Sequence, residues 1–220
     1  LDPLLRPDPL TMAPTPWLAE SWEVAAGGGS IAYRLRDDIP WHDGSAVTAA
    51  DVAFSFEVYR DDPASTVANF FARMRAVEAT DDRTVEVELS GNDPTWLFNA
   101  STVPILQRAQ YEEYWGVRPT GERTLAGFDW RSSPPIGSGP WRIEDWNRTR
   151  VRFAAVADHP LAAPWFDSLE VVWATSRGER LDAWRGGNAD MLWPVRSDEL
   201  DRLGDRPARL YAADAASVMF

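Results

Sequence analysis

The sequence predicts an α/β fold with an α+β subdomain, in which a mixed sheet is flanked by helices. In the last third of the chain, strand-like segments alternate with helix-like segments, which is typical of an α/β sheet. Earlier in the chain, strand-like segments are joined by short turns, which is typical of the hairpins in an α+β arrangement. With 220 residues, the chain can bury a sizeable core as one domain or as two small lobes.

Composition excludes several kinds of site. The chain has no cysteine, so neither a disulfide nor a thiolate metal site can form. Its two histidines, His42 and His159, lie far apart in the sequence and outside any zinc-binding pattern, so we expect no metal and no cofactor. The formal net charge of -12 argues against a nucleic-acid partner. No apolar run approaches the roughly 20 residues that are needed to cross a bilayer.

The first half of the chain contains a capped helix and a hairpin. Thr48, with Asp51 three residues later, is close to a capping box and predicts a helix that runs to about Tyr59. Residues 84–89 alternate apolar and acidic side chains, which predicts a strand with one wet face, and Asp81–Arg83 before it reads as a hairpin turn. We expect the proline-rich segment Pro3–Pro16 and the segment Arg118–Pro135 to be irregular connections.

The second half alternates strands and helices. Ser176 and Glu179 form a capping box, which predicts a helix that ends at Gly186-Gly187. The remaining segments are predicted from their alternation and their polar caps: strands at Arg150–Phe153, Leu169–Trp173 and Ala189–Trp193, a short helix at Ser197–Leu203, and a last strand at about Ala208–Ala213.

Catalytic interpretations are weak. His42 and Asp43 are adjacent, but neighbours at a strand end point to opposite sides, and Asp43-Gly44 is typical of a turn. The segment Gly137-Ser138-Gly139 matches neither a nucleophile elbow nor a dinucleotide-binding pattern, so we expect its glycines to let the backbone turn sharply into a strand. Asp and Glu are plentiful, which leaves a glycosidase-like carboxylate pair open, but no pair stands out.

The twelve tryptophans are an unusual feature of the composition. A large indole buries much apolar area wherever it packs, so we expect most of them to be structural. Trp193 differs, because it ends a predicted strand just before Pro194, where an open α/β sheet presents its loops to a crevice. There it could stack on a sugar ring or cover a peptide side chain, or it could simply be structural. The tryptophans that we expect to be structural are Trp17, Trp22, Trp41, Trp141 and Trp173.

Two blocks of sequence resemble a known family. The first runs from Pro16–Val24, through a strand ending in arginines, to the turn and helix start in Trp41–Ser55. The second, Pro135–Ile143, resembles a Gly-Thr-Gly-Pro-aromatic signature with Ser138 in the threonine position. Together, in this order, they resemble the family 5 solute-binding proteins of ABC transporters, which include dipeptide, oligopeptide, nickel and some oligosaccharide receptors, so the solute is left open as a peptide, an oligosaccharide or a metal chelate.

The resemblance implies a periplasmic-binding-protein-like fold of type II, with two lobes that close on a solute by hinge motion. It implies that the first large lobe comprises residues 1–46 and 132–220, and that a smaller inserted subdomain comprises residues 47–131. We expect the first strand and helix of that lobe, and the whole second large lobe, to lie outside this sequence.

The resemblance also implies function and site. We expect a non-catalytic receptor, periplasmic or anchored as a lipoprotein outside the cytoplasmic membrane, that passes a peptide or similar solute to an ABC permease. The alternative is a ligand-sensing module of a regulator or surface protein with the same fold, and a hydrolase is a third possibility. Pocket-lining residues are expected after the strand that ends at Trp193, near the chain's end, and at the subdomain edges: Trp193, Pro194, Asp214, Ala215, Ser217, Phe70 and Thr102.

Overall fold

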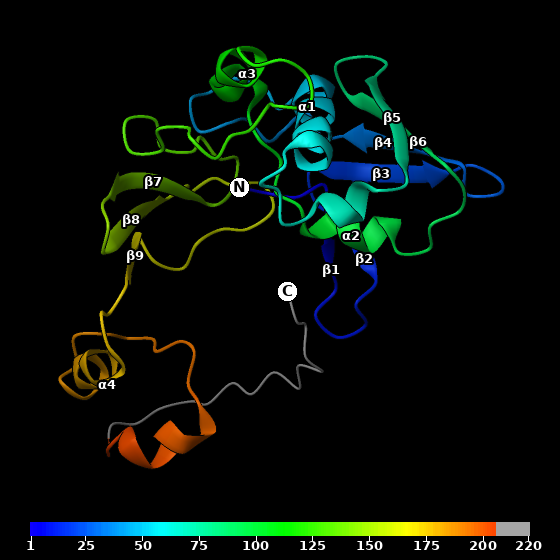
Figure 1. Cartoon of the computed structure of the whole chain (residues 1–220). Coiled ribbons are helices and arrows are strands. Elements are labelled where there is room, and N and C mark those ends of the chain that lie inside the picture. Colours follow the sequence, from blue (N-terminus) through cyan, green and yellow to red (C-terminus); the bar gives the residue numbers. More distant parts are fainter. Residues whose placement is uncertain (206–220) are drawn as a thin grey trace. The chain divides into compact units, whose positions relative to one another are not determined.

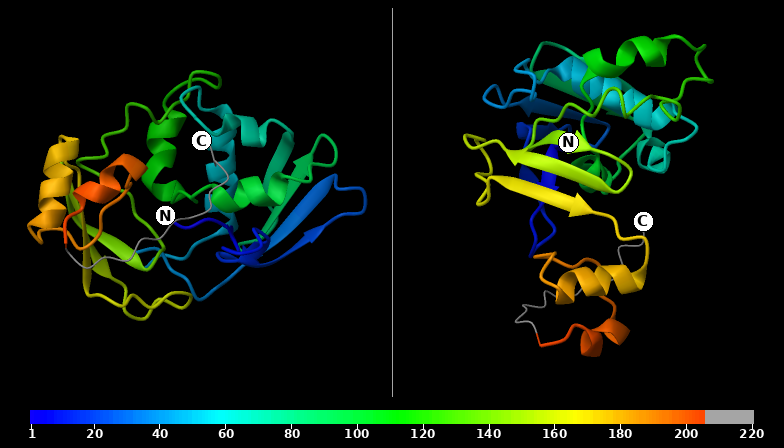
Figure 2. Two further views of the ribbon diagram at one scale, coloured as in Figure 1. Left: turned by 90° about the horizontal axis from the view of Figure 1, so that it is seen from below. Right: turned by 90° about the vertical axis from the view of Figure 1, so that its left-hand side faces the viewer.

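The structure is a computed structural model that describes residues 1–205, apart from the side chains of residues 100–102. The chain divides into two compact units, Leu1–Val171 and Val172–Phe220. Each unit is described by itself. Figures 1 and 2 show the ribbon from three directions.

The main sheet of the first unit has four antiparallel strands in the order β3-β4-β6-β5. On β6, the valines and Leu89 are buried whereas Glu86 and Glu88 are exposed, so the predicted strand with one wet face is confirmed. The predicted hairpin turn at Asp81–Arg83 joins β5 to β6. The strands are β3 (Ala19–Val24), β4 (Ser30–Leu35), β5 (Met74–Ala79) and β6 (Thr84–Leu89).

Helix α1 (Ala49–Asp61) packs against β5 and β6, as Figure 1 shows. Its predicted start is confirmed: the carboxylate of Asp51 accepts hydrogen bonds from the backbone N–H of Thr48 at 2.8 Å and from its hydroxyl at 2.9 Å. Because Val52 and Phe56 are fully buried, α1 forms one wall of the main core.

Aromatic side chains fill the centre of this core. Phe56, Phe71 and Trp96 meet in tilted or edge-to-face pairs with ring centroids 5.1 to 6.0 Å apart. The indole N–H of Trp96 donates to the hydroxyl of Tyr33 at 3.0 Å, which satisfies the polar end of a buried side chain. Phe71 ends the 3-10 helix η1 (Ala68–Phe71), and Trp96 begins α2 (Trp96–Thr102).

The proline-rich start of the chain is not irregular as predicted. It contains a two-stranded hairpin, β1 (Leu5–Pro7) and β2 (Pro14–Pro16), which packs against α2. Proline is tolerated there because both strands are short and each proline sits at a strand end. Asp8 closes the turn by accepting hydrogen bonds from Leu10 and Thr11.

A second core cluster lies where α3 (Arg108–Gly116) meets α1. Tyr111 of α3 packs on the rings of Phe128 and Trp130, which come from the segment between α3 and β7. This segment has neither helix nor strand between residues 118 and 135, so the predicted irregular connection is confirmed. Its aromatic side chains nevertheless anchor it to the helices.

A separate three-stranded sheet, in the order β7-β8-β9, completes the first unit (Figure 2). Antiparallel pairing of β7 with β8 places Ile143 opposite Phe153 and Trp146 opposite Val151. Every residue of β9 is exposed. The strands are β7 (Trp141–Trp146), β8 (Arg150–Ala155) and β9 (Ser168–Val172), which agrees with the strands predicted near these positions.

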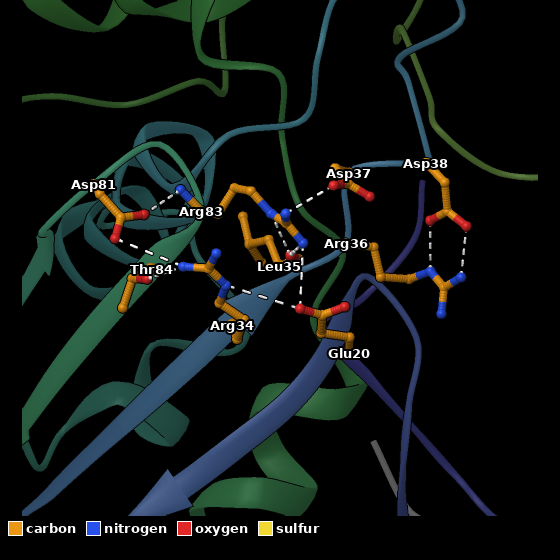
Figure 3. A network of polar contacts seen from close by, with 9 residues as sticks. All are labelled: Glu20, Arg34, Leu35, Arg36, Asp37, Asp38, Asp81, Arg83 and Thr84. Atoms are coloured by element: carbon orange, nitrogen blue, oxygen red, sulfur yellow. Dashed lines mark hydrogen bonds and ion pairs between the residues drawn. The ribbon is translucent and has the colours of Figure 1, made fainter.

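A polar network on the first unit ties the β5–β6 turn to the end of β4 (Figure 3). The guanidinium of Arg83 donates to the carbonyl oxygen of Leu35 at 2.8 and 2.9 Å, and it pairs with Asp37 at 2.8 Å and Glu20 at 3.2 Å. Exposed ion pairs add little stability individually. The contribution of Arg83 is therefore mainly to satisfy a carbonyl at a strand end and to fix the turn.

In the second unit, α4 (Arg177–Arg185) follows the predicted capping box: the hydroxyl of Ser176 accepts from the backbone N–H of Glu179 at 3.1 Å. The helix ends at Gly186, as predicted. The short helix predicted at residues 197–203 is present as the 3-10 helix η2 (Ser197–Arg202).

The strand predicted at Ala189–Trp193 is wrong, because these residues have no regular secondary structure. A strand needs a second strand to pair with, and none of the sheets formed by the described residues includes this segment. The strand predicted at about Ala208–Ala213 lies outside the described residues.

The division into lobes stays a prediction. The main sheet contains β3 and β4 from residues 1–46 together with β5 and β6 from residues 47–131. The predicted boundary at residues 46 and 47 therefore lies between two parts that share one sheet.

Candidate functional site

Hydrogen bonds of the His42 and Asp43 side chains hold the His42-Asp43-Gly44 turn in place. The imidazole of His42 bonds through Nε2 to the carbonyl oxygen of Gly139 at 2.7 Å, and Gly44 has φ of +88°. Asp43 accepts from the backbone and the hydroxyl of Ser45, and from the amide of Gln107 at 2.7 Å. These contacts make the turn a structural joint, as predicted.

The electrostatics of this turn fit the same interpretation. Hydrogen bonds from the Ser45 hydroxyl and the Gln107 amide lower the pKa of Asp43. Burial, partly offset by the bond to Gly139, lowers the pKa of His42. The lowered pKa values favour a neutral His42 and an ionised Asp43. Neither carboxylate oxygen of Asp43 bonds to the imidazole, so the two side chains do not form an acid/base pair.

Asp2, Ser138 and His159 form a buried polar cluster, and they are the residue types of a hydrolytic triad. The geometry differs from a triad. His159 Nδ1 accepts from the backbone N–H groups of Leu161 and Ala162, so Nε2 carries the proton and donates to the Ser138 carbonyl oxygen at 3.0 Å. The hydroxyl of Ser138 has no hydrogen-bond partner among the described residues. The serine therefore has no base, and the cluster does not support nucleophilic catalysis.

The glycines beside Ser138 are explained by close approach. A Cβ on Gly139 would lie 3.2 Å from the Asp2 carboxylate, and a Cβ on Gly137 would lie 3.0 Å from the His42 ring. Neither glycine has positive φ. The chain bends at Gly139-Pro140 just before β7, in line with the expected turn into a strand, and both glycines also let the backbone pass directly against two side chains.

The second unit exposes several large apolar side chains. The side chain of Trp193 is 83% exposed, and Met191 beside it is similarly open. The peptide bond between Trp193 and Pro194 is cis. Trp173, which was expected to be structural, is also exposed because β9 ends before it and no described element covers it. Of the other tryptophans expected to be structural, Trp41 is buried and the rest are half-buried: Trp17, Trp22 and Trp141.

The buried polar centre of the second unit is Glu199, whose side chain is 0% exposed. Oε1 accepts from Arg177 at 2.6 Å and from Arg180 at 2.5 Å, and Oε2 accepts from the backbone N–H of Arg196 at 2.8 Å. Hydrogen bonds, first from the Arg196 backbone and then from Arg177, lower the pKa of Glu199 to about 2. Two arginine side chains and one backbone N–H thus satisfy this buried carboxylate.

Two hollows open on the first unit. One, of about 360 Å³, lies where Ala50 and Phe54 of α1 face Arg108 and Trp115 of α3. The other, of about 450 Å³, is lined by Arg131, Trp146, Asn147 and Arg148. The second hollow was not predicted, although the run Trp146-Asn147-Arg148 at a hairpin turn is a signal that the sequence contains.

The structure places the predicted ligand-binding residues as follows. Trp193 and Pro194 are exposed neighbours in the second unit. Phe70 belongs to the first unit, where it is half-buried against the main core. Thr102 ends α2, and its side chain is not described. Asp214, Ala215 and Ser217 lie outside the described residues.

Other kinds of site lack support in residues 1–205. No group of three or more His, Cys, Asp or Glu in this part of the chain is placed to hold a metal ion. Among the described helices, none combines the length and the apolar character needed to cross a membrane.

Comparison with known proteins identifies a family. The model of the bacterial extracellular solute-binding proteins, family 5 Middle, matches residues 13–219. The probable ABC transporter periplasmic-binding protein SapA of Escherichia coli is 28% identical over 94% of this chain and 40% of its own length. A putative ABC transporter peptide-binding protein of Brucella ovis is 25% identical over 92% of this chain and 38% of its own length. The chain thus spans about two fifths of these relatives.

Solved structures share the fold. NikZ from Campylobacter jejuni, in complex with Ni(L-His), matches with a TM-score of 0.73 and 26% identity, over 86% of this chain and 36% of that one. The oligopeptide-binding protein AppA from Bacillus subtilis, in complex with a nonapeptide, matches with a TM-score of 0.73 and 22% identity, over 85% and 36%. The fold class predicted from the sequence, a partial type II periplasmic-binding-protein fold with sheets and flanking helices, is confirmed.

Proposed function

Because this chain belongs to the bacterial extracellular solute-binding proteins, family 5, we propose that it is part of the substrate-binding component of an ABC importer. The component binds a peptide or a similar solute outside the cytoplasmic membrane and delivers it to a permease. The observation that carries this proposal is the family match over residues 13–219. The matched relatives include ABC transporter peptide-binding and periplasmic-binding proteins.

The site chemistry supports binding without catalysis. The two histidines, which could have acted as catalytic bases, instead make structural hydrogen bonds to the backbone. His42 bonds to the carbonyl oxygen of Gly139, and His159 bonds to that of Ser138. Exposed Trp193 offers an apolar ring to a solute. We expect the solute to contact Trp193 and Pro194 of the second unit. The other residues that we expect to contact it are Phe70 and Thr102, and Asp214, Ala215 and Ser217.

Solved structures of similar proteins contain solutes of different chemical classes. Their structures hold a nickel–histidine complex, mannopinic acid and a nonapeptide. A peptide is favoured because the curated relatives include peptide-binding and oligopeptide-binding proteins. A receptor that encloses its solute draws contacts from both sides, and this chain spans about two fifths of these relatives, so binding is tested on the complete receptor.

The test is a titration of the complete receptor with a mixed peptide pool, followed by calorimetry with single peptides. Trp193→Ala should weaken peptide binding by about tenfold or more, because truncating an aromatic anchor that becomes buried on binding costs about 2 kcal/mol or more, and about 1.4 kcal/mol is tenfold. The matched control is Trp165→Ala, another exposed tryptophan that is not among the residues expected to contact the solute. Equal effects from both variants would remove Trp193 from the site.

Uptake separates transport from sensing. Deleting the gene should abolish accumulation of the bound peptide in cells. Normal accumulation after deletion, together with intact peptide binding by the protein, would instead support a ligand-sensing module.

A further inference from the structure

The hollow at the turn between β7 and β8 combines positive charge with an aromatic ring. It has a volume of about 450 Å³ and is lined by Arg131, Trp146, Asn147 and Arg148. Pockets that hold small molecules are typically a few hundred Å³ in size and combine apolar walls with a few placed polar groups. The hollow has both properties.

Its two arginines belong to the minority of described arginines that have no ion pair among the described residues. Most described arginines are ion-paired with an acidic side chain within 4 Å, including Arg150 and Arg152 on the same hairpin. Neither Arg131 nor Arg148 has such a pair among the described residues, although the chain carries a net charge of -12. Two guanidinium groups therefore share one hollow with hydrogen-bond donors available.

Both arginines lie in turns whose backbone is fixed by side-chain hydrogen bonds. Asn147 closes the β7–β8 turn, because its side-chain oxygen accepts from Thr149 and from the backbone N–H of Arg150. Asp129 closes the other turn by accepting from the backbone N–H of Arg131 and from the hydroxyl of Ser132 at 2.6 Å. Such anchoring fixes the backbone at both positions, so binding has to order only the side chains.

Asp129 is an acidic side chain close enough to Arg131 to interact with its positive charge. Its pKa is lowered first by the hydrogen bond from the Ser132 hydroxyl, and only last by the positive charge of Arg131. Its carboxylate oxygens are engaged by its own turn. Asp129 therefore reduces the positive charge near Arg131 without occupying the guanidinium.

We propose that this hollow binds a small organic carboxylate with a flat apolar body. The two guanidinium groups of Arg131 and Arg148 bind the carboxylate, since a planar guanidinium matches carboxylate geometry. The half-buried ring of Trp146 packs against the apolar body. None of the four lining residues is among those expected to contact the transported solute.

The test uses nuclear magnetic resonance on the whole chain with three probes. Benzoate carries both recognised features, benzamide lacks the charge, and inorganic phosphate lacks the apolar body. Benzoate should shift the side-chain N–H signals of Arg131, Arg148 and Trp146 saturably, and benzamide and phosphate should bind at least about tenfold more weakly. The indole signal is assigned with Trp146→Phe.

The double variant Arg131→Gln/Arg148→Gln should lower benzoate affinity by about tenfold or more, with unchanged amide dispersion. The control is Arg118→Gln, which removes another exposed arginine without an ion pair from outside the hollow. The proposal is overturned if benzoate causes no saturable shift, if benzamide or phosphate binds as well, or if the control variant has the same effect. None of these results bears on peptide binding by the complete receptor.

Discussion

The two units of the chain are stabilised in different ways. The first unit buries large aromatic side chains in a continuous core, with Trp41, Trp96, Tyr33 and Phe56 among them. In the described part of the second unit, the buried apolar side chains are Leu181 and Trp184, and the central buried group is the charged Glu199. The same unit exposes Met191 and Trp193 to solvent.

The contrast between the two units shows that the first unit buries its large apolar side chains within itself, whereas the described part of the second unit leaves several of them exposed. A core of interlocking aromatics depends on shape and loses several kcal/mol when one member is removed. A carboxylate covered by arginines depends on charge, so it responds to pH and adds less stability. Exposed aromatics in the second unit leave apolar area available to a solute or to further chain.

The largest effect is expected at Trp96, whose side chain is 1% exposed and bonded to Tyr33. Trp96→Ala should lower the free energy of unfolding by about 3–5 kcal/mol, because it opens a cavity between Phe56 and Phe71. Urea denaturation followed by circular dichroism measures the change. Trp165→Ala, at a 95% exposed tryptophan, should change it by less than about 0.5 kcal/mol. Similar losses for both would mean that the aromatic core does not dominate the first unit.

A smaller loss is expected at Asp51, a buried carboxylate that joins three segments. It accepts from the Trp41 indole at 3.3 Å, from Thr48, and from the backbone N–H of Arg108 at 2.7 Å. Asp51→Asn should cost about 2–3 kcal/mol, because the amide turns N–H groups toward these donors.

The control for Asp51 is Asp61→Asn on the same helix, where the carboxylate is partly exposed and pairs with neighbouring Arg60. It should cost less than about 0.5 kcal/mol. If the two substitutions cost the same in urea denaturation, the junction at Asp51 would be no stronger than a surface ion pair.

The first unit also shows which local signals are sufficient. The capping box at Thr48 and the alternation in residues 84–89 predicted α1 and β6, because their side chains satisfy the local rules by themselves. Helix α2 was missed because its N-cap, Thr95, makes no capping hydrogen bond and the helix is held by packing against β1. Helix α3 had a signal that was not used, the pair of Arg108 and Glu112 at 2.6 Å.

The candidate site was less predictable than the fold. A strand was predicted at Ala189–Trp193 from its pattern alone, but strand formation depends on a neighbour that no local pattern reveals. The hollow at Arg131 and Arg148 was missed because its sides are 17 residues apart in the numbering and meet only through the β7–β8 hairpin. Sequence signals thus identified the family, whereas the role of Trp193 stays a prediction and surfaces assembled from separate segments needed the structure.

In the second unit, the expected effect depends on pH. Glu199 has a folded pKa of about 2, below its usual 4.5, so the folded state binds fewer protons than the unfolded state in this range. Its contribution to stability is therefore complete above about pH 4.5 and is lost as the pH falls through about 2. The signals of Leu181 and Trp184 should broaden in this window, while those of the aromatic core persist.

Glu199→Gln should remove this pH dependence, because an amide does not titrate. Asp182→Asn, at an exposed carboxylate of α4, should retain it. If the acid transition of the second unit is unchanged in Glu199→Gln, the arginine-covered carboxylate does not control it.

The smallest effect on stability is expected at Trp193, in contrast to Trp96. Because its ring is 83% exposed, Trp193→Ala should change the free energy of unfolding by less than about 0.5 kcal/mol. Trp184→Ala, at the buried tryptophan of the same unit, should destabilise α4 clearly, as measured by hydrogen exchange of the α4 amides. A loss of about 2 kcal/mol or more at Trp193 would show that its ring belongs to the packing of the unit. A negligible loss, combined with weakened peptide binding in the complete receptor, would assign the exposed ring to the solute, since an aromatic side chain left open in the free protein retains apolar area to bury on binding.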